Sequence, residues 1–189
     1  MKAQPVPKKH LLSQAQLETL TSPVRLAIVQ RLEIDKQATA CELARRMGYP
    51  VTALYHHLKQ LEDAGVLRMV AERRGVGRPE TVYALIAEYL SSAKAVKTRP
   101  GRKAYGRAAS RVADAGARAF AAAVMRGSPK FAGKHRNTMA KFYLLRADKD
   151  KLARLNELLD ELDDAAVHSR EDGEEVQLTI LLSPVQRKG

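Results

Sequence analysis

Residues 52–64 read Thr-Ala-Leu-Tyr-His-His-Leu-Lys-Gln-Leu-Glu-Asp-Ala, and Gly65 follows them. Leu54, Leu58 and Leu61 stand at positions i, i+4 and i+7, the spacing of one apolar stripe on a short amphipathic helix. Gly65 can adopt the left-handed conformation that ends such a helix. The side opposite the stripe carries hydroxyl, ring and cationic groups, on Thr52, Tyr55, His56 and Lys59. This surface suits the major groove of DNA, but a solvated face on an ordinary three-helix domain is an equal alternative for this stretch alone.

A second short helix is expected directly before this one. Thr39 and Glu42 have the spacing of a capping box, and Gly48 closes the segment that they open. The turn at residues 48–50 then leads straight into residues 52–64. Two short helices joined by a turn that holds glycine, the second with an exposed polar side, make a helix-turn-helix.

Two further helices are expected upstream. Ser13 and Gln16 form another capping box, which opens a short helix. Ser22 is placed as the N-cap of the next helix, and Pro23 occupies its first position, where the missing N–H costs nothing.

Two β-prone runs follow Gly65, at residues 66–71 and 81–85. The loop between them, residues 72–80, is too basic and too rich in glycine to bury anything. Its position after the helix-turn-helix predicts the tip of a β-hairpin, or wing, and a flexible charged loop is the alternative. The cations expected to reach phosphates or a minor groove are Arg73, Arg74 and Arg78.

Four patterns in this region resemble the ArsR-type winged-helix transcriptional regulators. They are Leu20-Thr-Ser-Pro-Val-Arg-Leu-Ala-Ile, Cys41-Glu-Leu-Ala, Leu54-Tyr-His-His-Leu-Lys-Gln-Leu-Glu-Asp-Ala-Gly-Val-Leu and Gly77-Arg-Pro…Tyr83. They occur in the family's order within residues 12–88. The resemblance implies a homodimer that binds double-stranded DNA, with two recognition helices in adjacent major grooves and the wings beside them. Many members of the family are repressors released by a ligand, so the resemblance also implies a small-molecule effector.

Cys41 separates this chain from the metal-sensing members of that family. Those members carry Cys-x-Cys-Asp-Leu where this chain has Thr39-Ala-Cys41-Glu-Leu43. One sulfur cannot build the multi-thiolate site that soft metals require. We therefore predict that Cys41 is a small core residue, with a thiol or metal sensor as the alternative.

No chemistry of an enzyme is recognisable in the sequence. The adjacent His56 and His57 point about 100° apart on a helix and cannot share one ion, and we expect His57 to hydrogen-bond within the helix-turn-helix. No phosphate loop, nucleophile motif or zinc-spaced pair occurs. We predict no catalytic residue, no metal site and no cofactor.

The charge of the chain is unevenly placed. The net charge of +12 divides into +9 for residues 1–104, +7 for residues 105–141 and −4 for residues 142–189. A basic front implies a polyanionic partner, most simply nucleic acid. No apolar run approaches the ~18 residues of a membrane helix, residues 1–10 lack the apolar region of a secretory signal, and a lone cysteine suits a reducing compartment. These features predict a cytoplasmic protein that does not enter the membrane.

The remainder of the chain is expected to form a second region. Residues 89–104, which contain the breaker pair Pro100-Gly101, predict a linker. Residues 105–126 predict an Ala-rich helix that serves dimerisation or packs within one subunit. A strand around residues 138–145, a helix from Lys149 to about His168 with Asp148 as its cap, and a strand at 176–182 complete a strand–helix–strand module.

Together these features predict an α+β, mainly helical chain. It contains a winged helix-turn-helix domain (12–88), a linker (89–104) and a region for dimerisation or effector binding (105–189). The function expected is that of a sequence-specific transcriptional regulator. Besides the recognition helix and the wing, we expect phosphate contacts from Arg25, Arg45 and Arg46. The alternative is a protein–protein adaptor whose winged helix does not read DNA.

Overall fold

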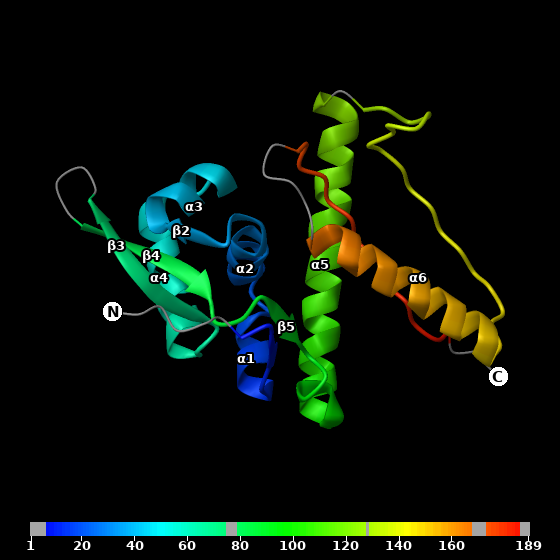
Figure 1. The fold of residues 1–189 in the computed structure, drawn as a ribbon, viewed down its shortest axis with the longest axis horizontal. Helices are drawn as coiled ribbons and strands as arrows, with labels where there is room; N and C mark the ends of the chain where they lie inside the picture. The colour runs from blue at the N-terminus through cyan, green and yellow to red at the C-terminus, as the bar shows by residue number, and fades with distance from the viewer. Residues whose placement is uncertain (1–6, 75–78, 128, 168–172, 186–189) are drawn as a thin grey trace. The chain divides into compact units, whose positions relative to one another are not determined.

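The computed structural model describes residues 7–74, 79–127, 129–167 and 173–185. The chain is α+β and mainly helical, as predicted, and it divides into two compact units. Unit 1 comprises Met1–Ala115 with Leu181–Gly189, and unit 2 comprises Gly116–Ile180 (Figure 1).

Unit 1 contains the predicted helix-turn-helix and its hairpin. Its first four helices are α1 (Gln14–Thr19), α2 (Pro23–Asp35), α3 (Ala40–Met47) and α4 (Val51–Asp63). The hairpin consists of β3 (Leu67–Arg74) and β4 (Pro79–Leu85), which pair antiparallel with a register shift between Met69 and Ala71. A short strand that the sequence did not indicate, β2 (Gln37–Thr39), pairs with the other edge of β4 and gives the order β2-β4-β3.

The core of unit 1 is built on the apolar stripe of α4. The side chains of Leu54, Leu58 and Leu61 are 0% exposed and pack with Ile28 and Leu32 of α2. Burial of one such side chain contributes about 1.5–3 kcal/mol relative to leaving it in water. The stripe predicted from the sequence is therefore the element on which the neighbouring helices pack.

The predicted capping boxes and glycine turns of unit 1 are confirmed, and Ser22 stands at the N-cap of α2 but makes no side-chain capping hydrogen bond. The side chains of Ser13 and Thr39 each accept from the backbone N–H three residues on, and the glutamine or glutamate at that position completes both capping boxes. Gly48 and Gly65 have φ angles of 68° and 64°. Because this left-handed region disfavours residues with a Cβ atom, the two glycines set the turns on either side of α4.

Residues 89–104, predicted as a linker, are ordered into regular elements instead. Strand β5 (Tyr89–Ser91) pairs in parallel with β1 (Lys9–Leu11), the short 3₁₀ helix η1 (Ala95–Lys97) follows, and α5 (Arg99–Arg126) begins six residues earlier than expected. Proline is tolerated there because the first turn of a helix needs no N–H from it.

Gly101 of the expected breaker pair serves a close contact. A Cβ atom at Gly101 would lie 1.9 Å from the carbonyl oxygen of Ala95, and the Gly101 N–H donates to Thr98 Oγ1 at 3.0 Å. The pair Pro100-Gly101 therefore starts α5 instead of interrupting the chain.

Unit 2 contains the second half of α5 and a separate helix, α6 (Lys149–Val167). Asp148 caps α6 as predicted, since its carboxylate accepts from Lys151 N at 2.8 Å. The two predicted strands of this region are wrong, because the described residues at 138–145 and 176–182 belong to no strand. A strand needs a neighbour for its N–H and C=O groups, and neither segment has one in the described chain.

Replacing Gly101 with alanine should destabilise unit 1 by roughly 1–3 kcal/mol, because the new methyl group overlaps a backbone oxygen that cannot move away alone. Denaturant unfolding followed by circular dichroism measures the change. Gly106→Ala is the matched control: nothing lies within 4 Å of its Cβ position, and alanine should raise stability by up to about 1 kcal/mol. Equal effects at both positions would contradict the packing described for Gly101.

Candidate nucleic-acid interface

The outer face of α4 carries the four side chains that the sequence assigned to DNA. Thr52, Tyr55, His56 and Lys59 are all exposed, on the side opposite the buried leucines. Tyr55 is 53% exposed, a large value for an aromatic residue in the middle of a helix. Lys59 Nζ lies 2.7 Å from Asp63 Oδ1, and this partner raises the pKa of the ammonium group. The structure thus brings hydroxyl, ring and cationic groups together on one solvent-facing surface.

The side chain of Gln16 holds the C-terminal end of α4. Its Nε2 donates to the carbonyl oxygens of Ala64 and Gly65, at 3.1 and 3.0 Å. Its Oε1 accepts from Ser13 N and lies 3.0 Å from His10 Nε2. One amide therefore caps α1 and satisfies carbonyls at the end of α4 that a helix leaves unpaired. The capping spacing of Gln16 was visible in the sequence, but its long-range bonds had no sequence signal.

Arg25 also fixes α4 within unit 1. Its Nε donates to the Thr19 carbonyl at the end of α1, and its Nη1 donates to Gln60 Oε1 on α4. The side chain is half-buried, and burial lowers its pKa. Arg25 was predicted to contact phosphate; in the structure two of its nitrogen atoms are bound inside the fold.

The remaining predicted cations fall into two groups. Arg73 lies 3.2 Å from Glu42, and Arg46 pairs with Asp35. Arg45 and Arg74 are exposed and form no ion pair within the described part of the chain. Arg78 lies outside the described residues.

Cys41 is exposed, so the prediction that it belongs to the core is wrong. Thr39 is the N-cap of α3, and this register turns Cys41 away from the buried Leu43 toward the wing. A hydrogen bond with the Glu80 carboxylate raises the pKa of the Cys41 thiol, and the negative charges of Glu80 and Glu42 act in the same direction.

The Cys41 thiol opens into a hollow of about 300 Å³ between α3, α4 and β4. Its lining comprises Ala40, Cys41, Tyr55, Pro79, Glu80, Thr81 and Tyr83. Because metals and oxidants react with the thiolate, a raised thiol pKa disfavours a sensor role. No cluster of three or more metal-ligating side chains occurs among the residues that the structure describes.

His57 does not make the hydrogen bond expected of it. Its Nδ1 is buried and has no partner in the described chain. Burial, followed by the positive charges of Arg25 and His56, lowers the pKa of His57. The neutral ring is therefore the form that this position favours.

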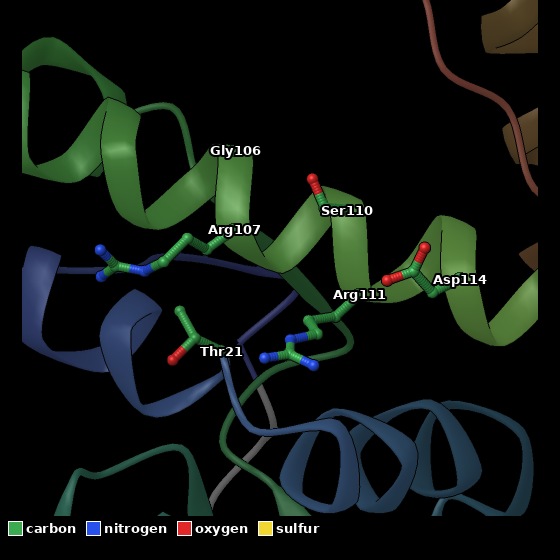
Figure 2. A pocket seen from close by; sticks show the side chains of 6 residues that line it. All are labelled: Thr21, Gly106, Arg107, Ser110, Arg111 and Asp114. Carbon is green, nitrogen blue, oxygen red and sulfur yellow. The ribbon is translucent and has the colours of Figure 1, made fainter.

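A second hollow, of about 450 Å³, lies between the α1–α2 turn and α5. Figure 2 shows the side chain of Arg111 directed toward the turn that carries Thr21, while the side chain of Arg107 extends from α5 along the same side of the hollow. Gly106, Ser110 and Asp114 complete the lining. None of the residues that line this hollow belongs to α4.

Comparison with known families identifies the region around α4. Residues 20–70 match a family model described as a helix-turn-helix domain. The match begins just before α2, includes all of α3 and α4, and ends within β3. The chain contains a helix-turn-helix domain. With the hairpin that follows, this domain is of the winged-helix type.

The other comparisons add two facts. A search of curated proteins finds no match to the chain. Within the described ranges, no helix is long and apolar enough to cross a membrane.

Exchanging Glu80 for glutamine should lower the pKa of Cys41 and speed its alkylation by iodoacetamide at about pH 8, because the carboxylate that disfavours the thiolate is removed. Cys41 is the sole cysteine of the chain, so labelling measured by mass spectrometry reports on it alone. Glu72→Gln on the exposed end of β3 makes the same charge change as a control and should leave the rate unchanged. Unaltered labelling of Glu80→Gln would refute the contact.

The unpartnered His57 should make stability depend on pH. The pKa of His57 is lowered in the folded chain, so as pH falls below about 6.5 the unfolded chain binds a proton that the folded chain does not. The free energy of unfolding should therefore decrease below that pH. His57→Gln should remove this part of the decrease, whereas His56→Gln at the exposed neighbouring position should retain it. Urea unfolding between about pH 5 and 8 tests the difference.

Proposed function

We infer that this protein is a sequence-specific transcriptional regulator that binds double-stranded DNA as a homodimer, with α4 in the major groove and the wing on the backbone or in the minor groove. The observation that carries the proposal is the two-sided character of α4 within a helix-turn-helix domain. Its leucine stripe is fully buried, while Thr52, Tyr55, His56 and Lys59 face solvent. The major groove of DNA is wide enough to admit an α-helix, and a helix held in this way can present its hydrogen-bonding groups to the base edges there.

The charges around α4 support binding to the phosphate backbone. Two cations are exposed on the elements that precede and follow α4 in the sequence. They are Arg45, on the last turn of α3, and Arg74, at the end of β3. Lys59, Arg46 and Arg73 are held in pairs with acidic side chains. The pairs of Lys59 with Asp63 and of Arg73 with Glu42 are at least partly exposed, so they contribute little to stability and phosphates can replace their carboxylates at small cost. The carboxylate that binds Arg46 is buried, and this cation stays on Asp35. Each cation that meets a phosphate releases counterions, and affinity should fall steeply with salt.

Tyr55 and His56 are the side chains proposed to read sequence. Both lie near the middle of α4 and both are exposed. Tyr55 also lines the hollow between α4 and β4, so a base or sugar placed there would contact its ring. Lys59 and the wing arginines carry charge and fix the position of the duplex, which is a role without sequence information.

The role of repressor, a cytoplasmic location and release by a small-molecule effector complete the proposal, and they rest on the resemblance to ArsR-type regulators. The hollow lined by Arg107 and Arg111 has the charge to accept an anion. It is the place in unit 1 where an effector search should begin.

The competing function is that of a protein–protein adaptor with a winged-helix fold. An adaptor would leave the α4 face without a polyanion partner, and the acidic end of the chain would be its working surface. The two functions differ in one simple property, since only a DNA binder loses orders of magnitude in duplex affinity as salt rises. The absence of binding to random duplex at low salt would favour the adaptor.

Arg74→Ala should weaken binding to every duplex and reduce the salt dependence of log Kd by about one, because one phosphate contact is lost. Tyr55→Ala should instead cost about 1–3 kcal/mol on preferred sites and change the order of preference among sites selected from random DNA. Fluorescence anisotropy at several salt concentrations measures both effects.

Lys103→Ala provides the matched control for charge. Lys103 is an exposed cation of unit 1 on α5, and its loss changes the net charge as much as that of Arg74. It should leave both affinity and salt dependence nearly unchanged. An equal loss in Lys103→Ala and Arg74→Ala would show that net charge alone drives binding and would contradict the assigned interface.

A further inference from the structure

Unit 2 exposes an apolar surface that its own elements leave uncovered. Val176, Leu178 and Ile180 alternate along an extended segment and are 67%, 60% and 48% exposed. Between them Thr179 packs on α5 so closely that a Cβ atom at Gly116 would lie 2.5 Å from Thr179 Oγ1. Because side chains of an extended chain alternate between two faces, one face of this segment lies against α5 and the apolar face points away from it.

A second extended segment of unit 2 has the same property. Phe142 and Leu144 are 93% and 85% exposed, and Tyr143 is largely exposed as well. No backbone–backbone hydrogen bond joins residues 139–147 to another part of the described chain. Aromatic and aliphatic side chains in such density, on backbone that has no strand partner, are typical of a surface that another chain covers. We call residues 139–145 and 176–180 the apolar extended surface.

The charges of unit 2 indicate which chain would cover it. Residues 129–147 contain five Lys/Arg and no Asp/Glu. Helix α6 contains six Asp/Glu against three Lys/Arg, and one of these three, Arg154, already pairs with Glu157 and Glu161. Unit 2 therefore carries a basic segment and an acidic helix. In the sequence, the basic segment includes residues 139–145, and α6 lies between them and residues 176–180. A two-fold axis brings unlike parts of two identical surfaces together, so each basic segment can face an acidic helix.

We propose that a second copy of this chain covers the apolar extended surface, with residues 129–147 of one copy against the acidic α6 of the other. The proposal rests on the homodimer of the proposed function and specifies where it forms. The two copies bury Phe142, Leu144, Leu178 and Ile180 between them, and the opposite charges of the basic segment and α6 fix their relative orientation. The proposed interface uses no residue of unit 1.

The experiment measures the dimer of the full chain by sedimentation equilibrium over a wide range of protein concentration. Leu178→Lys places a charge in the proposed interface and should raise the dimer dissociation constant by at least about tenfold. Leu178 is exposed in the single chain, so the substitution should leave the helical circular dichroism intact. Gln177→Lys adds the same charge on the opposite face of the same segment and should leave the dimer unchanged.

A second variant and the salt dependence test the two contributions separately. Phe142→Ser removes apolar area without adding charge and should also weaken the dimer at least about tenfold. Added salt should weaken the wild-type dimer, since the basic segment and α6 attract each other. A dimer that only strengthens with salt would overturn the charge pairing.

The remaining outcomes separate this proposal from the proposed function. A wild-type chain that stays monomeric, or a dimer that survives both Leu178→Lys and Phe142→Ser, overturns the interface even if the chain binds duplex DNA. Protection of residues 176–180 from hydrogen exchange in a monomer also overturns it, because the segment would then pair within one chain. A dimer weakened as expected in a chain that binds no duplex supports the interface and contradicts the DNA-binding function.

Discussion

The burial of the leucine stripe determines what α4 can present to a partner. Leu54, Leu58 and Leu61 are fully buried, and rotation of the helix about its axis would bring at least one of them into water. The exposure of one leucine costs about 1.5–3 kcal/mol, a large part of the stability of a small domain. Two further contacts prevent sliding along the axis, from Gln16 to the carbonyls after α4 and from Arg25 to Gln60. The outer face of α4 is therefore fixed by the fold of unit 1 itself.

Ion pairs place the cations next to that face. Arg73 is held by Glu42, and Glu42 is itself held by the backbone N–H of Thr39 as part of the capping box of α3. Arg46 is held by Asp35 at the end of α2, which also binds Arg31. Glu42 and Asp35 therefore each stabilise the fold and also hold an arginine side chain in place. Such preorganisation reduces the side-chain entropy that binding to an anion would otherwise cost. Only the partly exposed pair of Arg73 with Glu42 is weak enough to exchange partners readily, because Asp35 is buried.

Features encoded by neighbouring residues could be predicted from the sequence, and features made by distant residues could not. The capping boxes at Ser13 and Thr39, the glycine turns and the leucine stripe all lie within a few residues, and all are present. The strand β2, the β1–β5 pair and the start of α5 depend on contacts across the chain. Cys41 was misplaced because its apolar character suggested the core, while the register of the capping box turned it outward. The bonds of Arg25 and the unpartnered His57 were likewise set by tertiary packing.

The two strands that were wrongly predicted in unit 2 show what a hydrophobic pattern cannot predict. An alternation of apolar and polar residues indicates which face of an extended segment is apolar, but it does not indicate what covers that face. In unit 1, β4 obtains β2 and β3 as neighbours from its own chain, and its Val82 is fully buried. In unit 2 the segment at 176–180 has α5 on one face, and the described chain supplies no strand to pair with it. The same sequence signal therefore yields a sheet where the partner is internal and an uncovered surface where it is not. In the dimer proposed above, a second copy supplies the cover that unit 2 lacks within its own described chain.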